Sequence, residues 1–473
     1  MKTAYNPYLP PYEYVPDGEP RVFGDRLYLY GSHDEADNPA FCVGDYVVWS
    51  APCRDLGDWR YEGVSYARTA DPHNRDGART LFAPDVVQGR DGKYYLYYCL
   101  SFLPEFGVAI SERPEGPFEF YGHVRYPDGR NYDKFLPYDP SVLVEEDGRV
   151  YLYYGFVPEF RNGAMGKIEP SPGCMVLELE SDMLTVKGEA KQCLPASRNC
   201  EGTGFAPEHA YFEAPSMRKI GDVYYLLYSS QSKHELCYAT SQYPDRDFCY
   251  QGTIVSNGNV GYRGNEKPGY YTGNNHGGLV QVGEQWYIFY HRHTHAICSS
   301  RQGCAEKVYF DQEGRIPQVS TTSYGLRGEP LPGRGTYPAY IACHLEPRDR
   351  VAEIQYGREY KETEAYIYEE KTEEGYEHYI AHITDNIKWG YRDFVFEENT
   401  MLQVTLRGEA KGHLWIYADE SEKLCLAETD LEIQEGAGWT TVSVKLLDQP
   451  GVHGLYLVYR GTGHLDCKEI CLR

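Results

Sequence analysis

Apolar and polar positions along the first 320 residues follow a pattern that recurs five times. Each unit contains an acidic or histidine side chain, a short apolar stretch, a glycine-containing acidic turn and a tyrosine-rich apolar stretch. The tyrosine-rich stretches begin at Tyr28, Tyr95, Tyr151, Tyr225 and Tyr287, at intervals of 56 to 74 residues. Short apolar stretches joined by such turns predict a series of antiparallel β-hairpins.

A weaker pattern after the first four hairpins predicts two further strands in each unit. It consists of an apolar stretch, a polar turn and an outer stretch that ends near Gly63, Gly122, Gly188 or Gly252. Four strands in a unit of about 65 residues, repeated five times, are typical of a five-bladed β-propeller. The alternative is a β-sandwich with irregular loops, since sustained helical periodicity is absent from residues 1–320.

The second part of the chain has a different strand pattern. Residues 320–340 are rich in Thr, Ser, Gly and Pro, a composition typical of a linker. Alternating stretches then recur at the spacing of a β-sandwich. We therefore expect an all-β chain: a five-bladed propeller in residues 1–325, a linker in 326–340 and a jelly-roll-like β-sandwich in 341–473.

Each repeated unit carries one ionisable side chain, 10 to 12 residues before its strand tyrosine. These residues are Asp17, Asp85, Asp139, Glu213 and His276. Equivalent positions of a rotational repeat meet near its axis, so we expect the five side chains to lie close together. Hydrolysis of a glycosidic bond needs a protonated carboxyl and a carboxylate, and repulsion between close carboxylates keeps one of them protonated. Asp17, Asp139 and Glu213 can supply these roles.

Charge and composition narrow the range of partners. The chain carries 46 Lys and Arg against 70 Asp and Glu, a formal net charge of −24. Such a charge repels phosphate backbones and anionic lipids, so we expect neither nucleic acid nor a membrane as a partner. The 46 tyrosines suit β-structure and offer flat apolar faces to sugar rings, although most of them are expected to fill strands.

Targeting signals and cysteine pairs are also missing from the sequence. No stretch reaches the roughly 18 apolar residues of a spanning helix, and residues 1–7 lack the apolar core of a signal peptide. We therefore expect a cytoplasmic protein. The 14 cysteines are scattered without a Cys-x-x-Cys pair, which predicts reduced thiols rather than disulfides.

Three motifs around the proposed carboxyls occur in a specific order. They lie at residues 17–25, 138–142 and 212–216, and each precedes or begins a predicted inner strand. Together they resemble glycoside hydrolase family 43 over residues 1 to about 325. The resemblance implies an inverting five-bladed propeller that acts mainly on α-L-arabinofuranosides and β-D-xylosides. It also implies Asp17 as the general base, Asp139 as the pKa modulator and orienting residue, and Glu213 as the general acid.

The first motif departs from the family pattern. The family usually has Asp-Pro at this site, whereas Asp17 is followed by Gly18, and Glu19 precedes Pro20. Glu19 is therefore a rival candidate for the base. The carboxylates Glu201 and Glu208, upstream of the third motif, are expected to lie in a loop.

The same resemblance implies further site residues. Phe82 would form a wall of the sugar pocket, or else pack within an inner strand. Asp85 would bind sugar hydroxyls or a neighbouring backbone group. His276 would lie below the pocket, near a calcium ion or a water in the channel, or be a buried core histidine. Arg301 would contact substrate or a catalytic carboxylate, or lie on the surface.

Three alternating histidines form a separate pattern. His291, His293 and His295 would share one face of a strand, as the ligands of a transition metal can. No cysteine or spaced acidic ligand accompanies them. We therefore favour His291 at the end of a strand, with the other two facing solvent or the pocket rim.

Residues from about 340 to 473 resemble carbohydrate-binding module family 6 in the strand regions 395–406, 438–444 and 451–459. By that resemblance the module would bind glycan or calcium, although it would equally serve to support the propeller. Trp389, Tyr391 and Trp415 are candidate sugar platforms, with a place in the core as the alternative.

The combined pattern predicts an inverting exo-glycosidase that releases terminal α-L-arabinofuranosyl or β-D-xylosyl residues from oligosaccharides, as in xylan degradation. It needs no cofactor, and a structural calcium ion and a homo-oligomeric state stay open. The alternatives are a β-galactofuranosidase or galactosidase of the same fold, a glycoside phosphorylase and a non-catalytic sugar-binding propeller. A phosphorylase needs a basic cluster for phosphate, whereas the predicted axial residues are mostly acidic.

Overall fold

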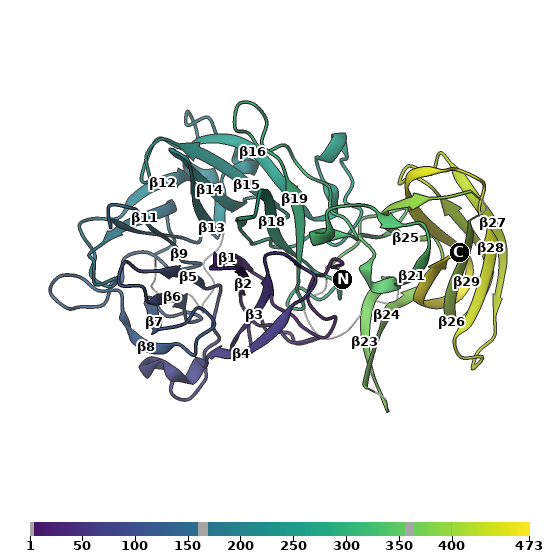
Figure 1. Ribbon diagram of the computed structural model, residues 1–473, viewed down its shortest axis with the longest axis horizontal. Helices are drawn as coiled ribbons and strands as arrows, with labels where there is room; N and C mark the ends of the chain where they lie inside the picture. Colours follow the sequence, from purple (N-terminus) through teal and green to yellow (C-terminus); the bar gives the residue numbers. More distant parts are fainter. Residues whose placement is uncertain (1–3, 159–168, 355–363, 374, 399) are drawn as a thin grey trace.

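The computed structural model describes residues 4–158, 169–354, 364–373, 375–398 and 400–473. Five small sheets surround a common axis, and a larger sheet-rich body lies beside the ring (Figure 1). Within the described residues the elements are strands and single-turn 3₁₀ helices, and no helix is long and apolar enough to cross a bilayer. The predicted all-β fold, a five-bladed propeller followed by a β-sandwich, is confirmed.

In the described part of the chain, four blades have four antiparallel strands and the fifth has three. The strands, in chain order, are β1 (Glu19–Phe23), β2 (Arg26–Tyr30), β3 (Tyr46–Pro52) and β4 (Arg60–Tyr66); β5 (Asp85–Gln88), β6 (Tyr94–Cys99), β7 (Phe106–Ser111) and β8 (Glu119–His123); β9 (Ser141–Val144), β10 (Val150–Tyr154), β11 (Gly173–Leu179) and β12 (Lys191–Pro195); β13 (Tyr211–Ile220), β14 (Val223–Ser230), β15 (Glu235–Ser241) and β16 (Cys249–Ser256); and β17 (Leu279–Val282), β18 (Gln285–Arg292) and β19 (Gln302–Val308). The 3₁₀ helices are η1 (Arg68–Ala70), η2 (Pro72–Asn74), η4 (Ser197–Asn199), η5 (Pro207–His209), η6 (Asn257–Asn259), η7 (Tyr262–Gly264), η8 (Gly325–Arg327) and η9 (Ala339–Ile341).

The tyrosine-rich stretches form the second strand of each blade, where their side chains fill the space between neighbouring blades. Tyr97, Tyr153 and Tyr154 are completely buried, and Tyr97 and Tyr153 donate their hydroxyl protons to carbonyl oxygens of other segments. A buried phenol needs such a partner, because an unpaired hydroxyl in the core costs free energy. Tyrosine thus supplies both apolar area and a polar link between blades.

The N-terminal segment closes the ring beside the fifth blade. The backbone N–H of Tyr8 donates to the Gly303 carbonyl at the edge of β19. The side chain of Asn6 accepts from the Ala305 N–H and donates to the Ala305 carbonyl. The segment therefore covers the strand edge that would otherwise be exposed.

The second body is one continuous sheet wound into two layers. Its strands are β20 (Leu331–Pro332), β21 (Gly335–Pro338), β22 (His344–Pro347), β23 (Tyr366–Thr372), β24 (Gly375–Ile383), β25 (Ile387–Phe396), β26 (Met401–Tyr417), β27 (Cys425–Ile433), β28 (Thr440–Lys445) and β29 (Gly451–Leu472). The long strands β26 and β29 pair along most of their length, and both also pair with shorter strands. They hold the two layers around a core of leucine and isoleucine side chains.

Residues 326–340 do not form the expected free linker. The strand β20 pairs with β25, and β21 pairs with the C-terminal end of β29. Glycine and proline in this segment permit short edge strands as well as loops. The segment therefore belongs to the sheet of the sandwich.

Two arginines join the propeller to the sandwich. The guanidinium of Arg292, on β18, donates to the carbonyl oxygens of Asn6 and Ala342. The guanidinium of Arg392, on β25, binds the Ser320 hydroxyl and the Glu420 carboxylate. The two bodies therefore share a polar interface close to the point where the chain passes between them.

Candidate active site

The inner strands place two rings of residues around the axis of the propeller. Pairing with the second strand of each blade identifies the equivalent positions. The lower ring consists of Glu19, Asp85, Ser141, Ser216 and Gly278, which face Tyr30, Tyr97, Tyr153, Leu227 and Phe289. Counting back two residues gives an upper ring on the same side of each strand.

The upper ring consists of Asp17, Ala83, Asp139, Ala214 and His276. In the fourth blade, the pairing shifts between Glu213 and Ser216, and Ala214 has a φ of 61°. This bulge turns the Glu213 side chain into the cavity in place of Ala214. The structure thus brings the three predicted catalytic carboxyls to one cavity.

Asp85 belongs to the lower ring, so the predicted contact with sugar hydroxyls is wrong. Its side chain is fully buried and forms a bidentate ion pair with Arg21, with an Nη2–Oδ2 distance of 2.6 Å. Its Oδ2 atom also accepts from the Val142 N–H at 2.8 Å. The spacing rule failed here because blade two has Ala83 at the upper position, two residues earlier in the strand.

Glu19 lies in the lower ring as well, which removes it as a rival base. Its carboxylate pairs with Arg218 at 2.6 Å. The ion pairs Glu19–Arg218 and Arg21–Asp85 fill the channel below the upper ring with two opposite charge pairs. The other rival carboxylates, Glu201 and Glu208, are exposed outside the cavity.

The cavity has a volume of about 390 Å³ and a largely aromatic wall. Phe82 lies 5.3 Å from Tyr138 between ring centroids, and Tyr138 stacks on Phe156 at 4.6 Å. Phe156 meets Phe212 edge to face at 5.3 Å. The volume and lining are those of a small-molecule pocket, and the ring faces suit the C–H groups of a sugar.

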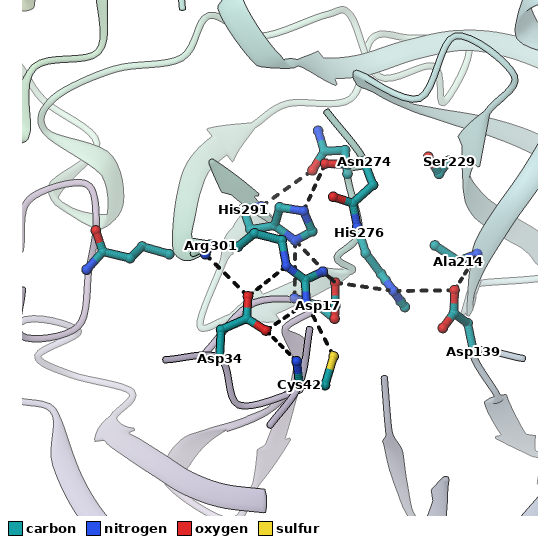
Figure 2. Close-up of polar contacts among 12 residues, drawn as sticks. Asp17, Asp34, Cys42, Asp139, Ala214, Ser229, Asn274, His276, His291 and Arg301 are labelled. Carbon is teal, nitrogen blue, oxygen red and sulfur yellow. Dashed lines mark hydrogen bonds and ion pairs between the residues drawn. The ribbon is translucent and has the colours of Figure 1, made fainter. Parts of the chain in front are cut away.

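Arg301 holds Asp17 in place within the cavity. Its Nη1 atom donates to Asp17 Oδ1 at 2.7 Å, while Nε and Nη2 bind the two oxygens of Asp34 at 2.8 and 3.1 Å (Figure 2). All three side chains are nearly inaccessible to solvent. The sequence alone did not indicate Asp34, which lies in the loop after β2.

Two histidines also approach Asp17. The Nδ1 atom of His291 accepts from the Asp17 N–H at 3.2 Å, so its Nε2 carries the proton and donates to the Asn274 carbonyl at 2.9 Å. Nδ1 of His276 lies 3.9 Å from Asp17 Oδ1 and 3.9 Å from Asp139 Oδ2 (Figure 2). Burial lowers the pKa of both imidazoles, which favours their neutral forms.

The environment gives the three carboxyls different protonation states. Burial acts to raise the pKa of Asp17, but the charges of Arg301 and the nearby histidines outweigh it and lower the pKa to about 2. Burial and repulsion from Asp17 raise the pKa of Glu213 to about 8. At neutral pH, Asp17 is therefore ionised and Glu213 is protonated.

Burial, with repulsion from Glu213 and Asp17, also raises the pKa of Asp139 well above its usual value. The anion nearest to Glu213 at neutral pH is therefore Asp17. Asp139 Oδ2 accepts from the Ala214 N–H at 3.1 Å, directly after Glu213. This contact fixes the bulge that carries Glu213.

The alternating histidines do not form a metal site. His291, His293 and His295 are all fully buried, so the expected exposure of the last two is also wrong. His291 and His293 share the Asn274 carbonyl, and Nε2 of His295 lies 2.9 Å from the Tyr14 hydroxyl. Each ring has a separate structural partner rather than a shared ion.

The residues around His276 do not fit a calcium ion. Calcium takes six to eight oxygen ligands. Near His276, however, Asp17 is bound by Arg301, and the lower-ring carboxylates of Glu19 and Asp85 are bound by arginines. Among the described residues, the groups of three or more ligating side chains within 4.8 Å lie elsewhere. We therefore assign His276 to the carboxyl network of the cavity.

Residues missed from the sequence share one location. The loop after the second strand of each blade contributes to the cavity, and these residues are Phe41, Cys42, Phe102, Phe156, Lys233 and Cys298. An inner strand begins at the same edge of the sheet where its hairpin partner ends. The end of each tyrosine-rich stretch was therefore the available signal for these loops, and it also applies to Arg301.

The candidate sugar platforms of the sandwich lie mostly in its core. Trp389 and Tyr391 are completely buried, whereas Trp415 is partly exposed on β26. Arg460 lies 5.8 Å from the Trp415 ring centroid and His413 lies 5.4 Å from it. Only Trp415 of the three keeps an accessible ring face.

Comparison with known proteins agrees with this geometry. A xylosidase/arabinosidase of Thermoclostridium stercorarium is 43% identical over 100% of this chain and 99% of its own length. A xylosidase/arabinosidase of Bacteroides ovatus is 31% identical over 62% of this chain and 89% of its own length. The crystal structure of the GH43_1 enzyme from Xanthomonas citri complexed with xylose covers 67% of this chain and 93% of its own, with 26% identity and a TM-score of 0.54. The model of glycosyl hydrolases family 43 matches residues 13–316, and the chain belongs to this family of glycoside hydrolases.

Proposed function

We propose that this protein is an inverting exo-glycosidase that releases terminal β-D-xylosyl or α-L-arabinofuranosyl residues from oligosaccharides. The observation that carries the proposal is the pairing of an ionised Asp17 with a protonated Glu213 in one aromatic-walled cavity. The names of the relatives from Thermoclostridium stercorarium and Bacteroides ovatus support xylose and arabinose as the released sugars.

Exo action is supported by the closed floor of the cavity. Below the upper ring, the ion pairs Glu19–Arg218 and Arg21–Asp85 occupy the channel. A substrate chain therefore has no through passage along the axis. A terminal sugar would enter the pocket while the rest of the oligosaccharide stays outside.

In the proposed mechanism, Asp17 removes a proton from a water molecule that attacks the anomeric carbon. Arg301, His276 and His291 all approach Oδ1 of Asp17, so we assign Oδ2 to the water. Glu213 donates its proton to the oxygen of the leaving group as the glycosidic bond breaks. Proton exchange with solvent then restores both groups. Asp139 orients the strand bulge that carries Glu213 and takes no proton in this scheme.

The assignment predicts different behaviour for two variants. Asp17→Asn should abolish hydrolysis of every substrate, because the water stays unactivated. Glu213→Gln should lose activity on xylobiose by at least 100-fold but retain much more on an aryl glycoside with an activated leaving group. Comparing kcat for both substrates tests the roles, and equal losses in the two variants would reject them.

Stereochemistry and sugar preference need separate measurements. Proton NMR of the first-formed product should show the inverted anomer, whereas retention would contradict attack by water. A panel of nitrophenyl furanosides and pyranosides should give the highest kcat/KM for xyloside or arabinofuranoside. Preference for galactofuranoside or galactoside would favour that alternative, and a phosphate requirement would indicate a phosphorylase. Sugar binding by the unmodified protein without turnover would indicate a binding protein.

A further inference from the structure

A second group of ionisable side chains lies in blade two, outside the catalytic cavity. Asp71 caps the single-turn helix η2, and His73 is within that helix. Glu105 immediately precedes β7, and His123 ends β8. Three separate segments therefore meet at two imidazoles and two carboxylates, and none of these residues lines the catalytic cavity.

The ligand atoms of this group lie close together. Nε2 of His123 is 3.2 Å from Asp71 Oδ2 and 3.7 Å from Glu105 Oε2. Nδ1 of His73 is 2.7 Å from the same Glu105 oxygen. The ligand atoms of Asp71, His73 and His123 all lie within 4.8 Å of one another. The two imidazole rings are stacked, with centroids 4.5 Å apart.

These distances fit tetrahedral coordination of a transition-metal ion. Zinc lies about 2.0–2.2 Å from histidine nitrogens and carboxylate oxygens, so neighbouring ligand atoms are separated by roughly 3.4 Å. The three observed separations, from 2.7 to 3.7 Å, bracket that value. Small shifts of side chains would therefore bring all four groups to one ion.

The surroundings of the cluster also suit a metal. The Asp71 carboxylate is fully buried, and it accepts from the Tyr98 hydroxyl at 2.5 Å and from the His73 N–H at 2.7 Å. Such outer hydrogen bonds orient a metal-binding carboxylate. The His73 side chain is 46% exposed, which gives an ion access from solvent.

A rival group in blade four fits less well. His209, Glu235 and Cys237 also lie within 4.8 Å of one another. However, the Glu235 carboxylate already binds His209 and the hydroxyls of Ser230 and Thr253. Burial raises the pKa of the Cys237 thiol well above its usual value, which opposes the thiolate that a metal requires.

We propose that Asp71, His73, Glu105 and His123 form a structural zinc site. Four protein ligands leave no open position for a substrate, so the ion would stabilise the fold rather than react. The segment from Asp71 leads along the chain to Phe82, and Glu105 follows Phe102 closely; both phenylalanines line the cavity. The ion would therefore hold together the two loops that carry this part of the aromatic wall.

Titration with zinc alone tests the site. The full-length protein is treated with a chelator, dialysed and titrated with Zn²⁺ in a calorimeter, and its Tm is measured with and without the ion. We expect one equivalent to bind and to raise the Tm. His73→Ala should weaken binding at least tenfold and remove the zinc-dependent rise, while the zinc-free Tm stays close to that of the parent because His73 is largely exposed.

Two variants control for other histidines. His413→Ala removes an exposed histidine that pairs with Asp430 on the sandwich, and it should leave zinc binding unchanged. His209→Ala removes the rival group in blade four. Absence of stoichiometric binding, equal binding by His73→Ala, or loss of binding in His209→Ala would overturn the proposal. With Co²⁺, visible d–d bands without a thiolate charge-transfer band are expected, and these bands should be lost in His73→Ala.

Discussion

Three carboxyls of the same chemical type acquire different charges in this cavity because their neighbours differ. Asp17 has the guanidinium of Arg301 at 2.7 Å, and Glu213 has no cation at that distance among the described residues. Asp139 has a single backbone donor, the Ala214 N–H. Position relative to Arg301 therefore decides which carboxyl acts as a base and which as an acid.

The pH dependence of activity should reflect these pKa values. Glu213 must be protonated to act, so kcat/KM should fall as pH rises through about 8. Asp17 must be ionised, and its pKa of about 2 keeps it charged throughout the mildly acidic range. The measurement is a pH profile with an unactivated disaccharide. An aryl substrate with an activated leaving group should lose less activity on the alkaline side, and identical alkaline limbs would contradict Glu213 as the acid.

Asp34 should act as a positioning residue through Arg301. Asp34→Asn removes the charge that holds two guanidinium nitrogens, so Arg301 would shift relative to Asp17. We expect kcat to fall about 10- to 100-fold with little change in KM, because small displacements at a reacting group are costly. Glu35→Gln, an exposed change in the same loop, is the matched control. A change in KM alone would contradict this role.

The motifs around Asp17, Asp139 and Glu213 were sufficient to place these residues in one site. Asp34 could not be found in the same way. It lies in the loop after β2, beyond the repeated strand pattern, and its role depends on the distant residue Arg301. Contacts between loops of different blades leave no periodic trace in the sequence.

At the scale of single elements, strand register decided what the repeat could predict. The turns and tyrosine-rich strands gave the hairpins of all five blades. They did not give the depth of each ionisable residue, because positions two residues apart face the same side of a strand. Asp85 was therefore placed one layer too high, and the bulge at Ala214 that brings Glu213 into the cavity had no signal in the spacing.

The lower ring should tolerate little extra volume at Gly278. A Cβ atom there would lie 2.7 Å from Glu19 Oε2 and 2.8 Å from both Arg218 Nη2 and Ser216 Oγ. Gly278→Ala should lower the free energy of unfolding by ~1–3 kcal/mol, because the inner strands and the ion pair cannot all move apart. Denaturant unfolding provides the measurement.

Ser216→Ala is the matched partner for this test. The Ser216 hydroxyl is buried without a hydrogen-bond partner in the described structure, so its removal alone should cost little. Combined with Gly278→Ala it should recover part of the lost stability, because one of the three close contacts disappears. Full additivity of the two changes would contradict the packing argument.

At the scale of the whole molecule, the interface between the propeller and the sandwich is part of the fold rather than a flexible join. The sequence predicted a linker in residues 326–340 because glycine and proline are common in both linkers and edge strands. What it could not predict was that β20 and β21 would find partners in β25 and β29, which are formed by residues far along the chain.

The two bodies should therefore unfold together. Arg392 joins Ser320 of the propeller side to Glu420 and Tyr456 of the sandwich. Arg392→Met should destabilise this junction by ~1–3 kcal/mol and split one calorimetric transition into two. Arg460→Met, which changes an arginine on the sandwich away from the propeller, should leave a single transition. Two transitions in the unmodified protein would contradict this coupling.

Closure of the ring by Asn6 and Tyr8 has a consequence for biosynthesis. These residues leave the ribosome first, yet the Ala305 groups that Asn6 binds are made 299 residues later. The first blade must therefore wait, with its neighbour on one side missing, until translation has passed β19. Nascent chains should stay sensitive to proteases until that point and become resistant abruptly once it has emerged.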